Sequence, residues 1–152
     1  MEKILIYGVG NPYRCDDAVG LKVAEHLEDV VKKSHITITS GSSDGLTMLD
    51  EIVGYDRVIF IDSIKTESGS PGDMYKVKVD PFEENPRLSV SHGIDFITAL
   101  RLGRQFGYIM PNSIDIYAIE IEDNASFGEE CTERVRASIP KVVKRIMEDI
   151  QK

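Results

Sequence analysis

Two continuous apolar runs constrain the fold of this chain most. Residues 3–7, "KILIY", and 57–61, "RVIFI", have the length of strands and lack the alternation of a half-exposed strand. Such runs are typical of central strands in a parallel sheet, which are buried on both faces. Three other segments, 36–39, 74–79 and 113–119, alternate polar and apolar residues, and the lysines of 74–79 indicate a strand near an edge. The sequence therefore predicts five strands.

Segments with helical periodicity separate these strands. Residues 17–33 place apolar side chains at helical spacing on one side and charged side chains on the other. Further helices are expected at about 45–53, at 93–106 and from about 129 to the C-terminus, where Pro140 should kink or split the helix. Strands that alternate with helices predict an α/β fold, a three-layer sandwich with a twisted, mostly parallel five-stranded sheet flanked by helices.

Composition and charge narrow the class of partner. The chain has a formal net charge of -8 and basic residues cluster only in short runs near the C-terminus, which argues against nucleic acid and anionic lipid. No apolar stretch approaches the length needed to span a membrane. Cys15 and Cys131 form neither a CxxC pair nor a metal-finger spacing, which favours reduced thiols and a cytoplasmic location. With no repeat and no linker, residues 1–152 are expected to form a single domain. The domain is expected to be a monomer.

Three polar residues are expected at the carboxyl ends of the strands, where ligands bind in open α/β sheets. Asp17 lies at the end of the loop after the first strand, Asp62 follows "VIFI", and His92 precedes a helix. Two carboxylates and one imidazole are suitable ligands for zinc or nickel. Each residue also has a structural interpretation: a helix-start aspartate favoured by the dipole, a carboxylate satisfied by a backbone cap, and a histidine in a capping turn.

Two long irregular segments and the first glycine loop are further candidates for binding. Segments 63–73 and 80–91 are long for a compact domain and could form binding loops. Gly8 and Gly10 form a GxG after a strand, as in dinucleotide-binding proteins, but Tyr13 stands where the third glycine of GxGxxG would be. No acidic residue ends the second strand to hold a ribose, so the nucleotide signal is weak.

The order of motifs resembles one known family. "GVGNP" at 8–12, followed by "DD" at 16–17 and Gly20, resembles the GxGNxxxxDDxxG signature of the hydrogenase maturation endopeptidases, which trim the large subunit of nickel-iron hydrogenases. "VIFIDSI" around Asp62 resembles the family's second acidic segment, "SPGDMYKV" its turn into an edge strand, and "SHGIDFITALRL" with His92 its histidine-led helix. The resemblance covers most of the chain.

The resemblance implies an endopeptidase that removes a short C-terminal extension from a hydrogenase large-subunit precursor after nickel insertion. It implies catalytic roles and metal contacts for Asp17, Asp62 and His92, with the nickel supplied by the substrate and no nucleotide cofactor. Four further residues are expected to contribute to the binding site: Gly10, Asn11, Asp16 and Gly41.

Some features leave alternatives open. The loop "SGSSDG" at 40–45 has Ser40 where family members often carry an aspartate, so that residue's role in positioning the substrate does not transfer directly. Asp16 could act as a ligand or as a helix cap. A nickel-binding maturation chaperone without peptidase activity would use the same three ligands, and a nucleotide-binding α/β enzyme would use the glycine loop.

Overall fold

The computed structural model describes residues 1–41, 44–83 and 87–151. Residues 42–43 of the loop 40–45 and residues 84–86 of the segment 80–91 lie outside the described residues. The elements, in chain order, are β1 (Ile4–Val9), the 3-10 turn η1 (Cys15–Ala18), α1 (Val19–Val30), β2 (Ile36–Gly41), α2 (Gly45–Ile52), β3 (Arg57–Ile64), β4 (Met74–Val79), α3 (Gly93–Gln105), β5 (Ser113–Glu120) and α4 (Glu133–Ile150).

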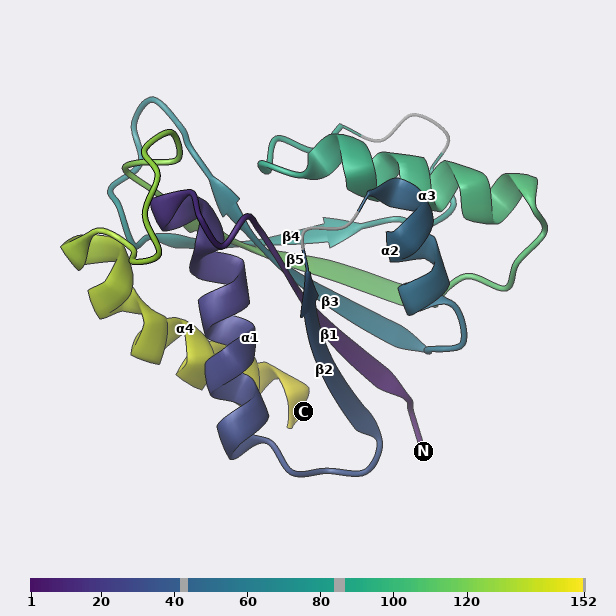
Figure 1. The fold of residues 1–152 in the computed structure, drawn as a ribbon. Coiled ribbons are helices and arrows are strands. Elements are labelled where there is room, and N and C mark those ends of the chain that lie inside the picture. The colour runs from purple at the N-terminus through teal and green to yellow at the C-terminus, as the bar shows by residue number, and fades with distance from the viewer. Residues whose placement is uncertain (42–43, 84–86, 152) are drawn as a thin grey trace.

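The strands form one sheet in the order β2-β1-β3-β5-β4. Neighbouring strands are parallel except β4, which runs antiparallel to β5. The two continuous apolar runs are the neighbouring strands β1 and β3 inside the sheet, and the lysine-bearing segment is the edge strand β4. The predicted α/β fold class, a mostly parallel five-stranded sheet flanked by helices, is confirmed (Figure 1).

Helices cover both faces of the sheet and give the molecule two cores. α1 and α4 pack on one face, and α2 and α3 pack on the other (Figure 1). The side chains of β3 alternate between these cores because successive residues of a strand point to opposite faces. Ile59 and Ile61 join the core under α1 and α4, whereas Val58 and Phe60 join the other, where Phe60 stacks on Phe96 at a ring-centroid distance of 4.3 Å.

β3 continues beyond its apolar run, which corrects two predicted boundaries. The pairing with β5 extends from Arg57↔Ser113 to Ile64↔Glu120, so backbone partners are available for three residues after Ile61. Asp62 therefore lies within a strand and does not follow its end. The irregular segment predicted to begin at residue 63 begins only after Ile64.

The structure also corrects two predictions about helices: where the first helix starts and whether Pro140 splits the last one. The helix expected from residue 17 starts as the 3-10 turn η1, and the α-helix proper begins at Val19. Pro140 does not split α4, because apolar residues on both sides of it, including Ile139 and Val142, hold the helix against the sheet. Among the described residues, no helix has the length and apolar character required to cross a bilayer.

The loop between β3 and β4 is held by one buried carboxylate. Glu120, at the end of β5, accepts hydrogen bonds from the Thr66 backbone N–H at 2.7 Å and from the Tyr75 hydroxyl at 3.1 Å. Gly69 lies so close that a Cβ there would meet the Glu120 side chain at 1.8 Å. Glu120 therefore holds this candidate binding loop in a defined position beside the carboxyl end of β5.

The strands β1 and β3, the loop after β1 and the start of α1 pack so closely that glycine is required at positions 10 and 20. A Cβ on Gly20 would lie 2.3 Å from the carbonyl oxygen of Ile61 and 2.6 Å from that of Val9. A Cβ on Gly10 would lie 2.1 Å from the carbonyl oxygen of Asp17. The close approach that a nucleotide-binding interpretation assigns to a pyrophosphate is made here by the chain's own backbone.

Candidate active site

The carboxyl ends of β1 and β3 form the position where open α/β sheets bind ligands. The chain leaves β1 for β2 on one side and then crosses to β3 on the other side, so the direction of strand order reverses between β1 and β3. Asp17 lies in η1, directly after the β1 loop, and Asp62 lies on β3. His92 reaches the same point from the N-terminus of α3.

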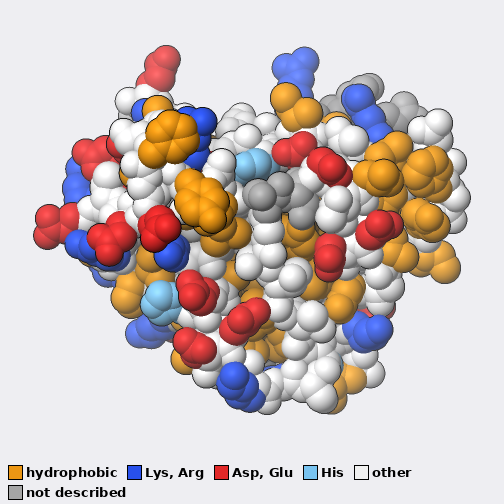
Figure 2. Space-filling model, viewed as in Figure 1, with side chains coloured by type: hydrophobic (Ala, Val, Ile, Leu, Met, Phe, Trp, Pro, Cys, Tyr) orange, Lys and Arg blue, Asp and Glu red, His pale blue; other side chains and the backbone are white. Residues whose placement is uncertain are grey.

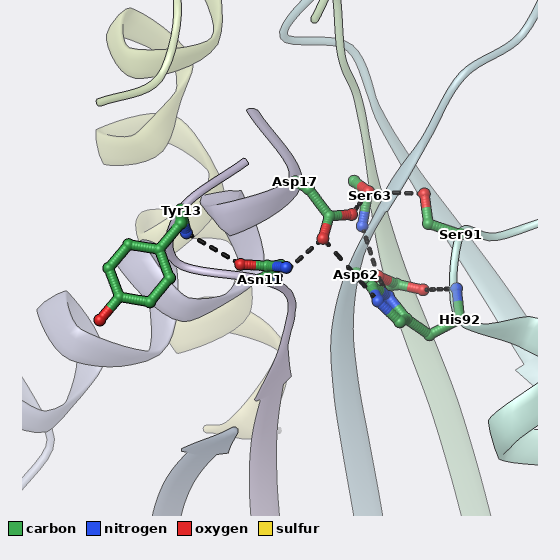
Figure 3. A network of polar contacts seen from close by, with 7 residues as sticks. All are labelled: Asn11, Tyr13, Asp17, Asp62, Ser63, Ser91 and His92. Atoms are coloured by element: carbon green, nitrogen blue, oxygen red, sulfur yellow. Dashed lines mark hydrogen bonds and ion pairs between the residues drawn. The ribbon is translucent and has the colours of Figure 1, made fainter. Parts of the chain in front are cut away.

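The structure brings the three predicted residues together (Figure 3). His92 Nδ1 lies 2.7 Å from Asp62 Oδ1, and His92 Nε2 lies 3.8 Å from Asp17 Oδ2. The side chain of Asp62 is fully buried, whereas those of Asp17 and His92 are 13% and 22% exposed. A ligand that enters this site therefore meets Asp17 and His92 first, with Asp62 behind the imidazole.

Asp62 fixes the orientation of His92. Its Oδ2 accepts the backbone N–H of His92 at 2.7 Å, and its Oδ1 accepts the Ser63 backbone N–H at 2.8 Å as well as the imidazole. Because a carboxylate can only accept, Nδ1 carries a proton, and the neutral ring then directs the Nε2 lone pair toward Asp17. Two lone pairs facing each other in this way favour a proton or a cation between them.

The electrostatic environment acts on both members of this pair. Burial raises the pKa of the Asp62 carboxyl, and the N–H groups that donate to it oppose that rise. The hydrogen bond to Asp62 raises the pKa of His92, while partial burial of the ring opposes the increase. The ring is therefore a more basic imidazole than a free histidine, which strengthens Nε2 as a donor.

Direct ligation by all three residues stays a prediction. In the part of the chain that the structure describes, no three His, Cys, Asp or Glu side chains are arranged to hold a metal ion by themselves. The reason is that Asp62 is turned to His92, which leaves Asp17 Oδ2 and His92 Nε2 as the pair of donor atoms at the opening. These two atoms could complete the coordination of an ion that is held mainly by another molecule.

Asn11 and the neighbouring glycines shape the loop that carries Asp17. The Asn11 backbone N–H donates to Asp17 Oδ2 at 2.8 Å, and Asn11 Oδ1 accepts the Tyr13 backbone N–H at 2.9 Å (Figure 3). Gly10 N–H donates to the carbonyl of Gly41 at 3.3 Å, which joins the ends of β1 and β2. These contacts orient Asp17 toward His92, and a direct role of Gly10, Asn11 and Gly41 in binding stays a prediction.

Two serines belong to the same network, and sequence reasoning missed both. Ser63 Oγ donates to Asp17 Oδ1 at 3.2 Å and lies 2.6 Å from Ser91 Oγ (Figure 3). Since the only hydroxyl proton of Ser63 goes to the Asp17 carboxylate, Ser91 is the donor in the bond between the serines. Their only signal in the sequence is adjacency, because Ser63 follows Asp62 and Ser91 precedes His92.

Asp16 is separated from this network, although it precedes Asp17 in the chain. Its fully buried carboxylate accepts the backbone N–H groups of Glu122, Asp123 and Thr132 at 3.0, 2.9 and 2.6 Å. These bonds join η1 to the segment between β5 and α4. The two roles predicted for Asp16 are a ligand and a helix cap. Its contacts support a structural role, but its partners, Glu122, Asp123 and Thr132, lie outside its own helix.

Replacing Asp16 with asparagine is expected to lower the free energy of unfolding by about 2 kcal/mol, because the new NH₂ group would face buried N–H donors. Urea denaturation followed by circular dichroism measures this change. The matched control is Asp29→Asn, at an exposed position on α1, where we expect a change within about 0.5 kcal/mol. Equal effects at the two positions would contradict a structural role for Asp16.

The two cysteines are poorly suited to nucleophilic attack. Both are free thiols. Desolvation, followed by the charges of Asp123 and Asp16, raises the pKa of Cys15, and burial raises the pKa of Cys131 to about 11. Because the thiolate is the reactive form, both side chains are in their unreactive state at neutral pH.

Comparisons with known proteins agree with one another. Residues 21–149 match the model of a family described as "Hydrogenase maturation protease". The hydrogenase 2 maturation protease of Escherichia coli is 30% identical over 112 residues, which cover 68% of this chain and 66% of that protein.

Two solved structures are similar over nearly the whole chain. The hydrogenase maturating endopeptidase HybD of E. coli aligns with a TM-score of 0.79 and 23% identity, covering 98% of this chain and 92% of that one. The hydrogenase maturation protease HycI of Thermococcus kodakarensis aligns with a TM-score of 0.75 and 25% identity, covering 99% and 94%.

Proposed function

Because this chain belongs to the hydrogenase maturation protease family, we propose that it removes a short C-terminal extension from a nickel-iron hydrogenase large-subunit precursor after nickel insertion. One observation carries the proposal: Asp17 Oδ2 and His92 Nε2 face each other 3.8 Å apart at the carboxyl edge of the sheet. A carboxylate and an imidazole together suit a divalent transition-metal ion. The nickel belongs to the precursor, and its contact with these two residues distinguishes a loaded precursor from an empty one.

The chain's own residues orient the reacting groups. Asp62 holds the tautomer of His92 that presents Nε2, so the donor atom is in place before the substrate arrives. Asp17 is held by the Asn11 N–H and the Ser63 hydroxyl, and it can accept a proton from an attacking water as a general base. The nickel in the substrate can supply a positive charge that polarises the scissile carbonyl or acidifies a water.

The test is intact mass spectrometry of a large-subunit precursor incubated with this protein. We expect a loss of mass equal to a short C-terminal peptide with nickel-loaded precursor, and no loss with nickel-free precursor or with the His92→Ala variant. Cleavage that is independent of nickel would contradict the recognition step. An unchanged mass of a loaded precursor that nevertheless binds the protein would favour a maturation chaperone without peptidase activity.

Removing the Ser63 hydroxyl is expected to slow cleavage about tenfold, because Asp17 then loses the bond that fixes its second oxygen. Ser63→Ala and Ser91→Ala are compared by the rate of precursor cleavage, with a smaller effect expected for Ser91→Ala, since Ser91 acts on Asp17 only through Ser63. The matched control is Ser138→Ala, a buried serine on α4 that bonds the Val135 carbonyl. If Ser138→Ala slows cleavage as much as Ser63→Ala, the effect reflects general packing.

A further inference from the structure

Exposed apolar side chains stand on two sides of the candidate active site. On one side, Tyr13 and Phe127 are 61% and 80% exposed, and on the other, Leu46 and Ile94 are 55% and 81% exposed. Figure 2 shows hydrophobic side chains exposed on this face of the molecule, to the left and to the right of its centre. Single apolar residues on a surface need no explanation, but a grouping around a site marks a binding surface. We call Tyr13 and Phe127 the aromatic lip, and Leu46 and Ile94 the aliphatic lip.

The aromatic lip is built by two loops that are hydrogen-bonded to each other. The Gly128 N–H donates to the carbonyl of Tyr13 at 2.9 Å, and the Cys15 N–H donates to the carbonyl of Gly128 at 3.0 Å. The Arg14 guanidinium lies 4.6 Å from the centre of the Phe127 ring. These contacts fix the loops that carry both aromatic residues, while the two rings stay exposed to solvent. Because the rings are not buried, they add little hydrophobic stabilisation to the fold.

The aromatic lip is also connected to the reacting groups. Tyr13 donates its backbone N–H to Asn11, and Asn11 donates its own backbone N–H to Asp17 (Figure 3). The loop that carries Tyr13 is therefore hydrogen-bonded, through Asn11, to Asp17.

The aliphatic lip is built by the first turns of two helices. Leu46 is the second residue of α2, and Ile94 is the second residue of α3. The helices begin side by side, since a Cβ on Gly45 would lie 3.1 Å from the carbonyl oxygen of Asp95. Ile94 is two residues after His92, so this lip borders the imidazole as the aromatic lip borders Asp17.

We propose that the two lips bind apolar side chains of the precursor on opposite sides of the scissile bond. The inference rests on the proposed function, because the substrate of an endopeptidase extends in both directions from the bond that is cut. The aromatic lip adjoins Asp17 through Asn11, and the aliphatic lip adjoins His92 at the start of α3, while Tyr13 and His92 lie on opposite sides of Asp17 (Figure 3). A substrate chain that crosses the site can therefore contact one lip on each side of the reacting pair. The occupant is an extended segment of the precursor with apolar residues near the cut.

Steady-state cleavage of nickel-loaded precursor tests the proposal. Phe127→Ser and Ile94→Ser are each expected to raise KM about tenfold with little change in kcat, because the lips contact the substrate away from the reacting atoms. The matched control is Ile109→Ser, at a position that is 90% exposed but follows α3 at its other end, and its kinetics should equal those of the unmodified protein. A lowered kcat with unchanged KM, or an equal effect of Ile109→Ser, would overturn the proposal.

Precursor variants identify which lip meets which side of the cut. Apolar residues of the precursor on either side of the scissile bond are replaced with serine, one at a time, and combined with each lip variant. A precursor residue that contacts a lip should give a combined effect smaller than the product of the two single effects. Independent effects for every pair would overturn the proposal that the lips bind the precursor, while leaving the proposed function intact. Failure of the unmodified protein to cleave loaded precursor would overturn both proposals.

Discussion

Replacing Asp62 with asparagine is expected to lower the rate of precursor cleavage by on the order of 10²-fold or more. Both oxygens of Asp62 accept N–H groups, one from the backbone of His92 and one from its ring. Asparagine has a single acceptor oxygen, so its NH₂ group would face one of these donors and release the ring from its present tautomer. Single-turnover cleavage of nickel-loaded precursor, followed by mass spectrometry, measures the loss.

Asp115→Asn is the matched control for this change. Asp115 is also a buried aspartate on a central strand, but it pairs with Arg57 at 3.6 Å and takes no part in the Asp17–His92 network. We expect its cleavage rate to stay within about twofold of the unmodified protein, as for a residue that does not touch the reacting groups. If both variants lose activity equally, cleavage depends on buried charge in general and not on the orientation of His92.

Replacing Gly20 with alanine is expected to lower the free energy of unfolding by about 3 kcal/mol or more. The new methyl group would meet the carbonyl oxygens of Ile61 and Val9, and neither strand can move without disturbing the sheet. Because Gly20 lies in the first turn of α1, displacement of the helix would also move Asp17. Urea denaturation gives the stability change.

Gly103→Ala provides a contrast within another helix. There the added methyl group meets the end of the Met110 side chain at 2.3 Å, and a methionine can adopt another rotamer. Alanine also favours a helix over glycine by about 1 kcal/mol. We therefore expect a small net change at Gly103, and a loss there equal to that at Gly20 would show that the backbone contact of Gly20 is not the cause.

The fold could be predicted because its strongest signals are local. The runs at 3–7 and 57–61 are apolar at every core position, and they identified the neighbouring strands β1 and β3. The end of β3 could not be predicted in the same way. Asp62 and Ser63 are polar residues that become buried through partners distant in the chain, and the hydrophobic pattern carries no trace of those partners.

The membership of the site was predictable only in part. Asp17, Asp62 and His92 could be singled out because each has a potential metal-ligating group near the expected edge of the sheet, and the structure brings the three side chains together. Asp16 and Asp17 are equivalent in sequence, yet the 3-10 turn directs one toward Thr132 and the other toward His92. Their different environments depend on the local backbone geometry of η1, which the prediction of a regular helix from residue 17 missed.

The hydrogen bond between Asp16 and Thr132 has a consequence for the order of folding. These two residues are separated by 116 positions, so the loop that presents Asp17 acquires its anchor only after most of the chain has been synthesised. Contacts of such long range form late, because closing a long loop costs conformational entropy before the contact forms. A nascent chain that has made β1 but not the segment around Thr132 thus lacks the anchor of η1, and we expect the loop that presents Asp17 to become fixed only after that segment has been made.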